Sequence, residues 1–240
     1  MSEQRPQGPD RLDAVTFFDA QAQEYEQLSR QSPRFNERFA VWEELIDAHA
    51  PSREPSRCLD LGCGVGTLSR FAAARGFQTL GLDGSPAMIE KSRSLSGEQG
   101  DRLEFRETMI PLDDTLMDEL EGTADLLLAS SVVEYLDDAP GFMAQCERLL
   151  RRGGIAVVSF PNATSLYRRI EPLLKFRGSN YLRMKPRQYT RRDAGELAES
   201  AGLTVIEARY FAFPSLRLSR MIKRRSPLLA TMFALVLRKN

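Results

Sequence analysis

The sequence is poor in the residues that hold metals or form disulfides. Its 240 residues include three cysteines and one histidine. Cys58, Cys63 and Cys146 are an odd number without metal-ligand spacing, which favours reduced thiols in a cytoplasmic protein. With His49 as the single histidine, we expect no metal site. We also expect neither a membrane span, which needs roughly 20 consecutive apolar residues, nor a signal peptide.

The chain has no net charge, but its charges are unevenly distributed. Residues 1–164 contain 16 Lys and Arg against 28 Asp and Glu, whereas residues 165–240 contain 17 against 5. An anionic partner would therefore approach the basic C-terminal third, although a solvated basic surface explains the same charges.

Strand and helix patterns alternate from residue 57 onward, which is typical of an α/β fold with a parallel sheet and helices on both faces. We expect strands at 57–62, 77–83, 102–107, 124–133, 155–162, 203–211 and 231–239. We expect helices at 12–29, 34–49, 67–76, 85–95, 139–154 and 190–202. Residues 161–189 interrupt the pattern, and so long an irregular stretch is usually functional.

A glycine-rich turn, GCGVG, lies between the first expected strand and the helix that follows it. A dinucleotide-binding fingerprint would place its third glycine where Thr67 stands, after Gly62 and Gly64. Asp60 precedes the turn, and its carboxylate would repel a pyrophosphate. The turn therefore favours a ligand that carries positive charge, such as an amino or sulfonium group.

Asp83 ends the second expected strand. A carboxylate at this place can accept hydrogen bonds from both hydroxyls of a ribose, and it disfavours a 2′-phosphate. Asp83 is not needed as a helix cap, because Ser85 precedes Pro86 at the start of the next helix.

These segments resemble the class I S-adenosylmethionine-dependent methyltransferases. The resemblance is carried by LDLGCGVG, GLDGSPAMIEKS, ADLLLASSVVEYLDDAPGFMAQCERLLRRGG and IAVVSFPN. Within this family, the sequence resembles the branch that contains ubiquinone-biosynthesis O-methyltransferases and natural-product methyltransferases. The resemblance implies a Rossmann-like, seven-stranded, mostly parallel sheet with an antiparallel C-terminal hairpin. It divides the chain into N-terminal helices at 1–50, forming a lid over cofactor and substrate, and a methyltransferase domain at 51–240 with a substrate-side insertion at about 161–189.

The resemblance also implies S-adenosyl-L-methionine as the methyl donor, with S-adenosyl-L-homocysteine as the product. The methionine part would contact Asp60, Gly62, Cys63, Gly64, Gly66, Ser130 and Ser131. Asp83 would hold the ribose, and the adenine would contact Gly84, Met88, Thr108, Met109 and Ile110. Tyr25 would close over the cofactor from the N-terminal region. Many relatives carry Gly-Asp-Ala after the third strand, whereas this chain has RETMIP, so the usual acidic contact is missing or comes from Glu107.

Methyl transfer is an in-line displacement at a sulfonium carbon, which depends mainly on positioning within a desolvated pocket. A hydroxyl acceptor also benefits from a base. Glu134, Tyr135 and Tyr189 are the candidate catalytic or orienting residues. His49 is more typical of a helix-end histidine, and Tyr167 and Tyr181 are further candidates for the acceptor pocket.

The function that these features favour is methyl transfer to an oxygen or nitrogen of a small-molecule metabolite, acidic or lipophilic. The basic C-terminal third also suits a carrier-protein-bound acceptor or peripheral contact with an anionic membrane. A nucleic-acid acceptor is less favoured, because the aromatic residues are not interleaved with the basic ones. A cofactor-binding protein without catalysis explains the glycine turn equally well.

Overall fold

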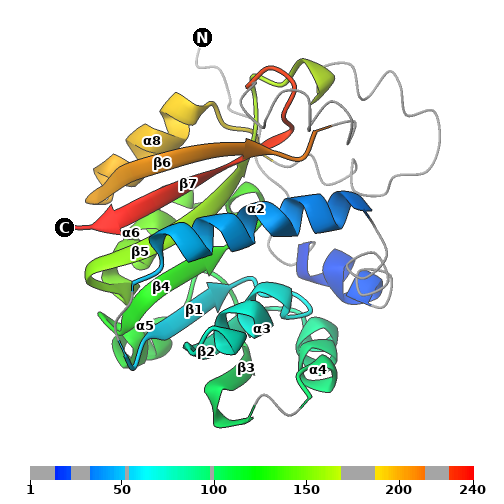
Figure 1. Cartoon of the computed structure of the whole chain (residues 1–240), viewed down its shortest axis with the longest axis vertical. Coiled ribbons are helices and arrows are strands. Elements are labelled where there is room, and N and C mark those ends of the chain that lie inside the picture. The colour runs from blue at the N-terminus through cyan, green and yellow to red at the C-terminus, as the bar shows by residue number, and fades with distance from the viewer. Residues whose placement is uncertain (1–13, 23–32, 52–53, 98–99, 169–186, 214–226) are drawn as a thin grey trace.

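A computed structural model of the protein describes residues 14–22, 33–51, 54–97, 100–168, 187–213 and 227–240. Its centre is a seven-stranded sheet with the strand order β3-β2-β1-β4-β5-β7-β6 (Figure 1). The strands are β1 (Arg57–Leu61), β2 (Gln78–Asp83), β3 (Leu103–Glu107), β4 (Ala124–Ala129), β5 (Leu150–Pro161), β6 (Leu203–Phe211) and β7 (Met232–Lys239).

The first five strands are parallel, and β7 lies antiparallel between β5 and β6. In the middle of the sheet, Leu59 pairs with Leu80 on one side and with Leu127 on the other. All six residues of β4 are buried, as expected for a strand covered on both faces. The predicted fold class is therefore confirmed, including the C-terminal hairpin.

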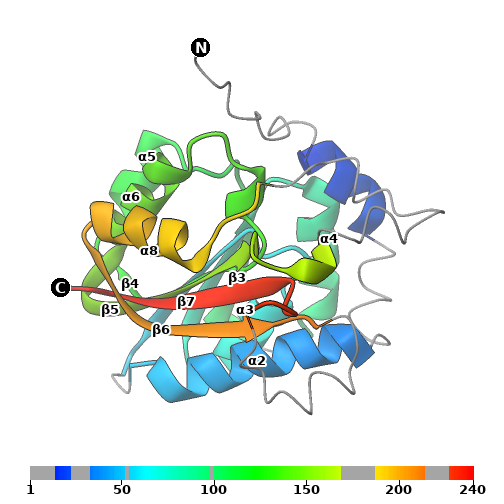
Figure 2. The ribbon, with the colours of Figure 1, turned by 90° about the horizontal axis from the view of Figure 1, so that it is seen from above.

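Helices cover both faces of this sheet (Figure 2). They are α2 (Pro33–His49), α3 (Thr67–Ala74), α4 (Pro86–Leu95), α5 (Asp114–Leu120), α6 (Ala139–Leu149) and α8 (Arg191–Ser200), and residues 14–22 are also helical. Phe142 and Met143 of α6 pack in the core on one face, and Trp42 and Leu45 of α2 pack in the core on the other. The two faces are thus buried in separate apolar clusters.

Three local predictions were wrong. The strand expected at 124–133 ends at Ala129, because the next residues turn away from the sheet. The helix expected at 139–154 ends at Leu149, because Leu150 pairs with Ala124 and a register shift in β4–β5 accommodates the residues that follow. The unpredicted α5 begins at Asp114 and is capped by Asp113, whose side chain accepts a hydrogen bond from the backbone of Leu116.

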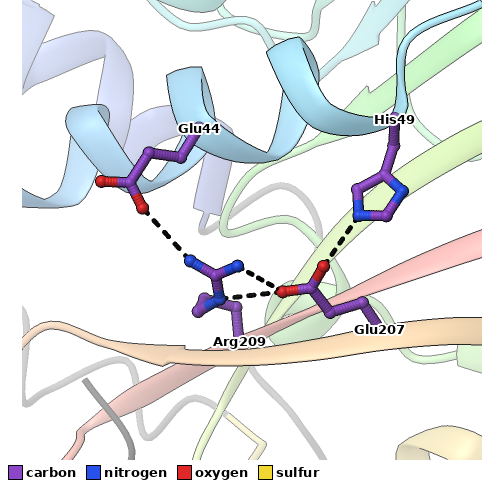
Figure 3. Close-up of polar contacts among 4 residues, drawn as sticks. All are labelled: Glu44, His49, Glu207 and Arg209. Atoms are coloured by element: carbon purple, nitrogen blue, oxygen red, sulfur yellow. Dashed lines mark hydrogen bonds and ion pairs between the residues drawn. The ribbon is translucent and has the colours of Figure 1, made fainter. Parts of the chain in front are cut away.

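A polar network joins the end of α2 to β6 (Figure 3). Arg209 binds Glu44 of α2 at 3.1 Å and Glu207 of its own strand at 2.9 Å. Glu207 also lies 2.7 Å from the Nε2 atom of His49. Partial burial opposes ionisation of Glu207, but the contacts with His49 and Arg209 outweigh it and lower the pKa of this carboxyl. His49 therefore anchors the C-terminal end of α2, as its interpretation as a helix-end residue predicts.

Candidate active site

A cavity lies where the glycine turn and the carboxyl ends of β1, β2 and β4 meet. Its lining includes most of the residues that the sequence predicts for the cofactor: Asp60, Gly62, Cys63, Gly64, Asp83, Gly84, Met88, Met109, Ile110, Ser130 and Ser131. Parallel strands present their carboxyl ends at one edge of a sheet, so residues far apart in the chain meet there.

The three glycines of the turn have different roles. Their φ angles are +70° at Gly62, +54° at Gly64 and +73° at Gly66, all in the left-handed region that favours glycine. A Cβ atom on Gly62 would lie 2.4 Å from a methyl carbon of Val132, and one on Gly66 would lie 2.5 Å from the ring of Phe105. A Cβ on Gly64 would meet no atom within 4 Å, so Gly64 is the glycine that leaves space for a ligand.

Asp83 is fixed by two backbone donors. Its Oδ2 atom accepts a hydrogen bond from the backbone N–H of Gly64, and its Oδ1 atom accepts one from Ser85, both at 2.8 Å. Burial raises the pKa of this carboxyl, although the two hydrogen bonds act in the opposite direction. A carboxylate oxygen can accept more than one hydrogen bond, so both oxygens of Asp83 retain capacity for ligand hydroxyls.

Asp60 and Thr67 place further polar atoms at the cavity. Asp60 is 1% exposed and accepts a hydrogen bond of 2.6 Å from the hydroxyl of Ser69. Burial raises the pKa of Asp60 to about 7, and the nearby Asp83 acts in the same direction. The buried hydroxyl of Thr67 has no hydrogen-bond partner among the residues described. A ligand with a cationic group would therefore satisfy this end of the cavity.

The helix at residues 14–22 covers the cavity. Ala14, Val15 and Phe18 contribute to the lining, and the Phe18 ring packs edge-on against Tyr135 at 5.4 Å between centroids. Asp19 accepts hydrogen bonds from the Ser85 hydroxyl at 2.7 Å and from the Ala87 backbone at 2.9 Å. These hydrogen bonds lower the pKa of Asp19. The cover is thus attached to the start of α4, next to Asp83.

The three candidate catalytic residues take different places. Tyr135 lines the cavity directly. Glu134 is fully buried, and neither carboxylate oxygen has a hydrogen-bond partner among the residues described. Burial raises the pKa of Glu134 to about 7, although Arg38 and Arg168 act in the opposite direction.

Tyr189 is 8% exposed and packs edge-on against Phe160 at 5.3 Å, and its hydroxyl also lacks a partner in the described part of the chain. Burial raises the pKa of this hydroxyl. Neither Tyr189 nor Glu134 is among the described residues that line the cavity.

The remaining predicted residues lie elsewhere. Gly66 is the N-cap of α3 and packs on Phe105, and Thr108 donates its backbone N–H to the Asp83 carbonyl at 2.9 Å. Neither is among the described residues that line the cavity. Tyr25 and Tyr181 lie outside the described residues, as do all of the basic residues at 169–186 and 214–226.

Phe18, Asp19 and Arg38 are site residues that sequence reasoning missed. Each acts through a contact with a distant segment, as the separation of 66 residues between Asp19 and Ser85 illustrates. No local motif marks such contacts. Within the described ranges, His, Cys, Asp and Glu do not gather in threes as metal ligands would, and no helix is long and apolar enough to cross a membrane.

A cavity lined by a glycine turn, with Asp60 near the end of β1, Asp83 at the end of β2 and an antiparallel β7 in the sheet, is the arrangement of a class I S-adenosylmethionine-dependent methyltransferase. The methyltransferase domain family matches residues 34–208. The chain belongs to this family, which confirms the resemblance seen in the sequence.

Curated relatives agree with this assignment. The ubiquinone biosynthesis O-methyltransferase of Caulobacter sp. (strain K31) is 34% identical over 111 residues, which cover 46% of this chain and 43% of the relative. The enzyme of the same name from Sinorhizobium medicae (strain WSM419) is 32% identical over 139 residues, covering 57% and 53%. The chain thus spans about half the length of the curated relatives that it matches.

Solved structures share the fold across nearly the whole chain. The magnesium protoporphyrin IX methyltransferase of Synechocystis PCC 6803, solved with bound S-adenosylhomocysteine, has a TM-score of 0.65 at 17% identity and covers 96% of this chain and 100% of its own. The [4+2]-cyclase SpnF has a TM-score of 0.70 at 13% identity, with 98% and 97% covered. At these identities the likeness shows the fold alone.

Proposed function

We propose that this chain transfers the methyl group of S-adenosylmethionine to an oxygen or nitrogen of a small-molecule acceptor. The observation that carries the proposal is the cavity in which Gly64, Asp60 and Asp83 meet beneath the 14–22 helix. The names of the curated relatives favour an oxygen as the methylated atom.

The cofactor would be held mainly by polar groups that the fold has already oriented. Asp83, fixed by Gly64 and Ser85, would accept hydrogen bonds from the ribose hydroxyls. Asp60 would face the positively charged methionine part, together with the backbone of Gly62, Cys63 and Gly64, the carbonyls of Ser130 and Ser131, and the Thr67 hydroxyl. Gly84, Met88, Met109 and Ile110 would contact the adenine.

When bound, the cofactor supplies an electrophilic methyl group on a sulfonium. The protein's part is then to exclude water and to align the acceptor with that carbon. Phe18 and Tyr135 close the cavity with apolar surface, which would help to exclude water. Tyr135 is the candidate that lines the cavity, so it would contact the acceptor directly. Glu134 and Tyr189 are candidates to orient the acceptor or to take its proton, and the backbone N–H of Arg187 links their segments by donating to the Glu134 carbonyl.

We propose that residues 1–50 serve as the cover of the domain at 51–240, with the acceptor entering beside the insertion at 161–189. The basic C-terminal third supports an acidic acceptor, a carrier-protein-bound one, or one presented at an anionic membrane. The second candidate function is cofactor binding without catalysis, because the cavity residues serve both.

Calorimetry with S-adenosylhomocysteine tests the donor site. We expect wild-type protein to bind it and Asp83→Asn to weaken binding by about 100-fold, because charge-assisted hydrogen bonds contribute about 1.5–3 kcal/mol each. Asp113→Asn, which alters the cap of α5 away from the cavity, is the matched control. Unchanged affinity in Asp83→Asn contradicts the ribose assignment.

A labelled-methyl assay on size-fractionated lysate tests the acceptor. We expect label in the small-molecule fraction. Label only in macromolecules would overturn the small-molecule proposal, and tight cofactor binding with no label in any fraction would favour the non-catalytic function.

A further inference from the structure

Ser131 has an unusual backbone conformation at the edge of the cavity. Its φ is +60°, and Ala212 is the only other non-glycine residue with a positive φ in the described ranges. Such a conformation is strained for a non-glycine residue and persists only where its surroundings enforce it. Ser131 lines the cavity, so its strain falls at the functional site.

Two hydrogen bonds hold Ser131 from opposite sides. Its backbone N–H donates to the hydroxyl of Ser159, a fully buried residue of β5, at 2.9 Å. Its own hydroxyl accepts a hydrogen bond of 3.1 Å from the guanidinium of Arg38 on α2. The next residue, Val132, packs where a side chain on Gly62 would stand. The position of Val132, and with it the space beside Gly62, therefore depends on the conformation of Ser131.

Arg38 reaches this turn from outside the cavity. It is not among the described lining residues, whereas Phe35, one turn earlier on α2, is. Its guanidinium also lies over the Phe211 ring, 5.9 Å from the centroid, and it opposes the effect of burial on the pKa of Glu134. Arg38 thus connects the cavity-facing part of α2 with the carboxyl ends of β4 and β6.

We propose that Arg38 is a positioning residue, which holds the strained Ser131 turn and the start of α2 in the arrangement that binds the cofactor. This inference rests on the proposed function, since it concerns the same cavity. In this proposal, Arg38 affects cofactor binding by holding Ser131 and does not contact the cofactor itself. A purely structural role would instead be limited to attaching α2 to the sheet.

The test measures the affinity of S-adenosylhomocysteine by calorimetry in four variants. Arg38→Met should weaken binding about tenfold, because it removes a charge-assisted hydrogen bond from the turn. Arg38→Lys, which keeps a cationic donor, should recover most of that loss. Ser131→Ala removes the acceptor, so Arg38→Met with Ser131→Ala should bind no more weakly than Arg38→Met alone.

Glu44→Gln is the matched control, because it loosens α2 at a different attachment, the pair with Arg209. It should leave affinity within twofold of wild type even where the melting temperature falls. Wild-type affinity in Arg38→Met, additive losses in the double variant, or an equal loss in Glu44→Gln would each overturn the inference. Failure of the wild type to bind S-adenosylhomocysteine would instead refute the proposed function.

Discussion

Replacing Asp60 by asparagine should stabilise the folded protein while weakening its cofactor site. Asp60 is 1% exposed, and its carboxyl accepts a hydrogen bond from Ser69 in a cavity wall. Burial therefore penalises its ionised form, which is the form that attracts a cationic ligand. Asparagine has nearly the same shape, keeps an acceptor for Ser69 and carries no charge.

The pKa of Asp60 sets the size and the sign of this effect. A pKa of about 7 in place of 3.8 corresponds to about 4 kcal/mol at about 1.36 kcal/mol per pH unit. We expect about half of this gain, about 2 kcal/mol at pH 8, because the new amide hydrogens are themselves costly to bury. Between pH 4 and 7 the folded wild type holds a proton that the unfolded chain releases. Its stability therefore falls as the pH rises through this interval, and above it the full penalty of the ionised Asp60 remains without further change with pH.

Chemical denaturation at pH 5 and pH 8 measures both quantities. The advantage of Asp60→Asn over the wild type should grow from pH 5 to pH 8, since other groups titrate equally in both proteins. Calorimetry should show S-adenosylmethionine binding weakened at least about 30-fold, the result of leaving a buried cation without its partner. Ser69→Ala is the control and should lower stability at pH 8. A variant less stable than wild type at pH 8, with a difference independent of pH, would refute the reasoning.

Three further predictions concern the glycine turn, the cover and the α2 anchor. Gly66→Ala should lower the free energy of unfolding by about 3 kcal/mol in urea denaturation, because it adds a clash to a positive φ. Gly64→Ala should cost about 1 kcal/mol and mainly weaken S-adenosylhomocysteine binding. Equal stability losses in the two variants would contradict this difference between the two glycines. Asp19→Asn should weaken the attachment of the cover to Ser85 and speed S-adenosylhomocysteine dissociation about threefold in stopped flow, and an unchanged rate would exclude Asp19 from this role. Glu207→Gln should cost about 1 kcal/mol at pH 7, and the cost should decline as the pH falls through the lowered pKa of Glu207. A cost that does not decline as the solution is acidified would show that charge is not its origin.

The cavity around the glycine turn could be predicted from the sequence because its determinants are local. Asp60 lies near the end of β1, and the glycine turn follows this strand directly. Asp83 and Ser85 lie at the turn into α4, where Ser85 caps the helix as predicted. Strand, turn and helix signals of this kind depend on neighbouring residues. The end of β4 was mispredicted for the opposite reason, since the positive φ of Ser131 depends on Ser159 and Arg38.

The cover and the acceptor side depend on contacts between distant segments, which the sequence pattern does not reveal. Asp19 meets Ser85, and Ser85 in turn donates its backbone N–H to Asp83, so the cover shares a residue with the predicted ribose site. If the cofactor binds Asp83 as proposed, we expect it to favour the same arrangement of Ser85 that holds the cover in place. By this linkage, we expect cofactor binding and attachment of the cover to stabilise each other.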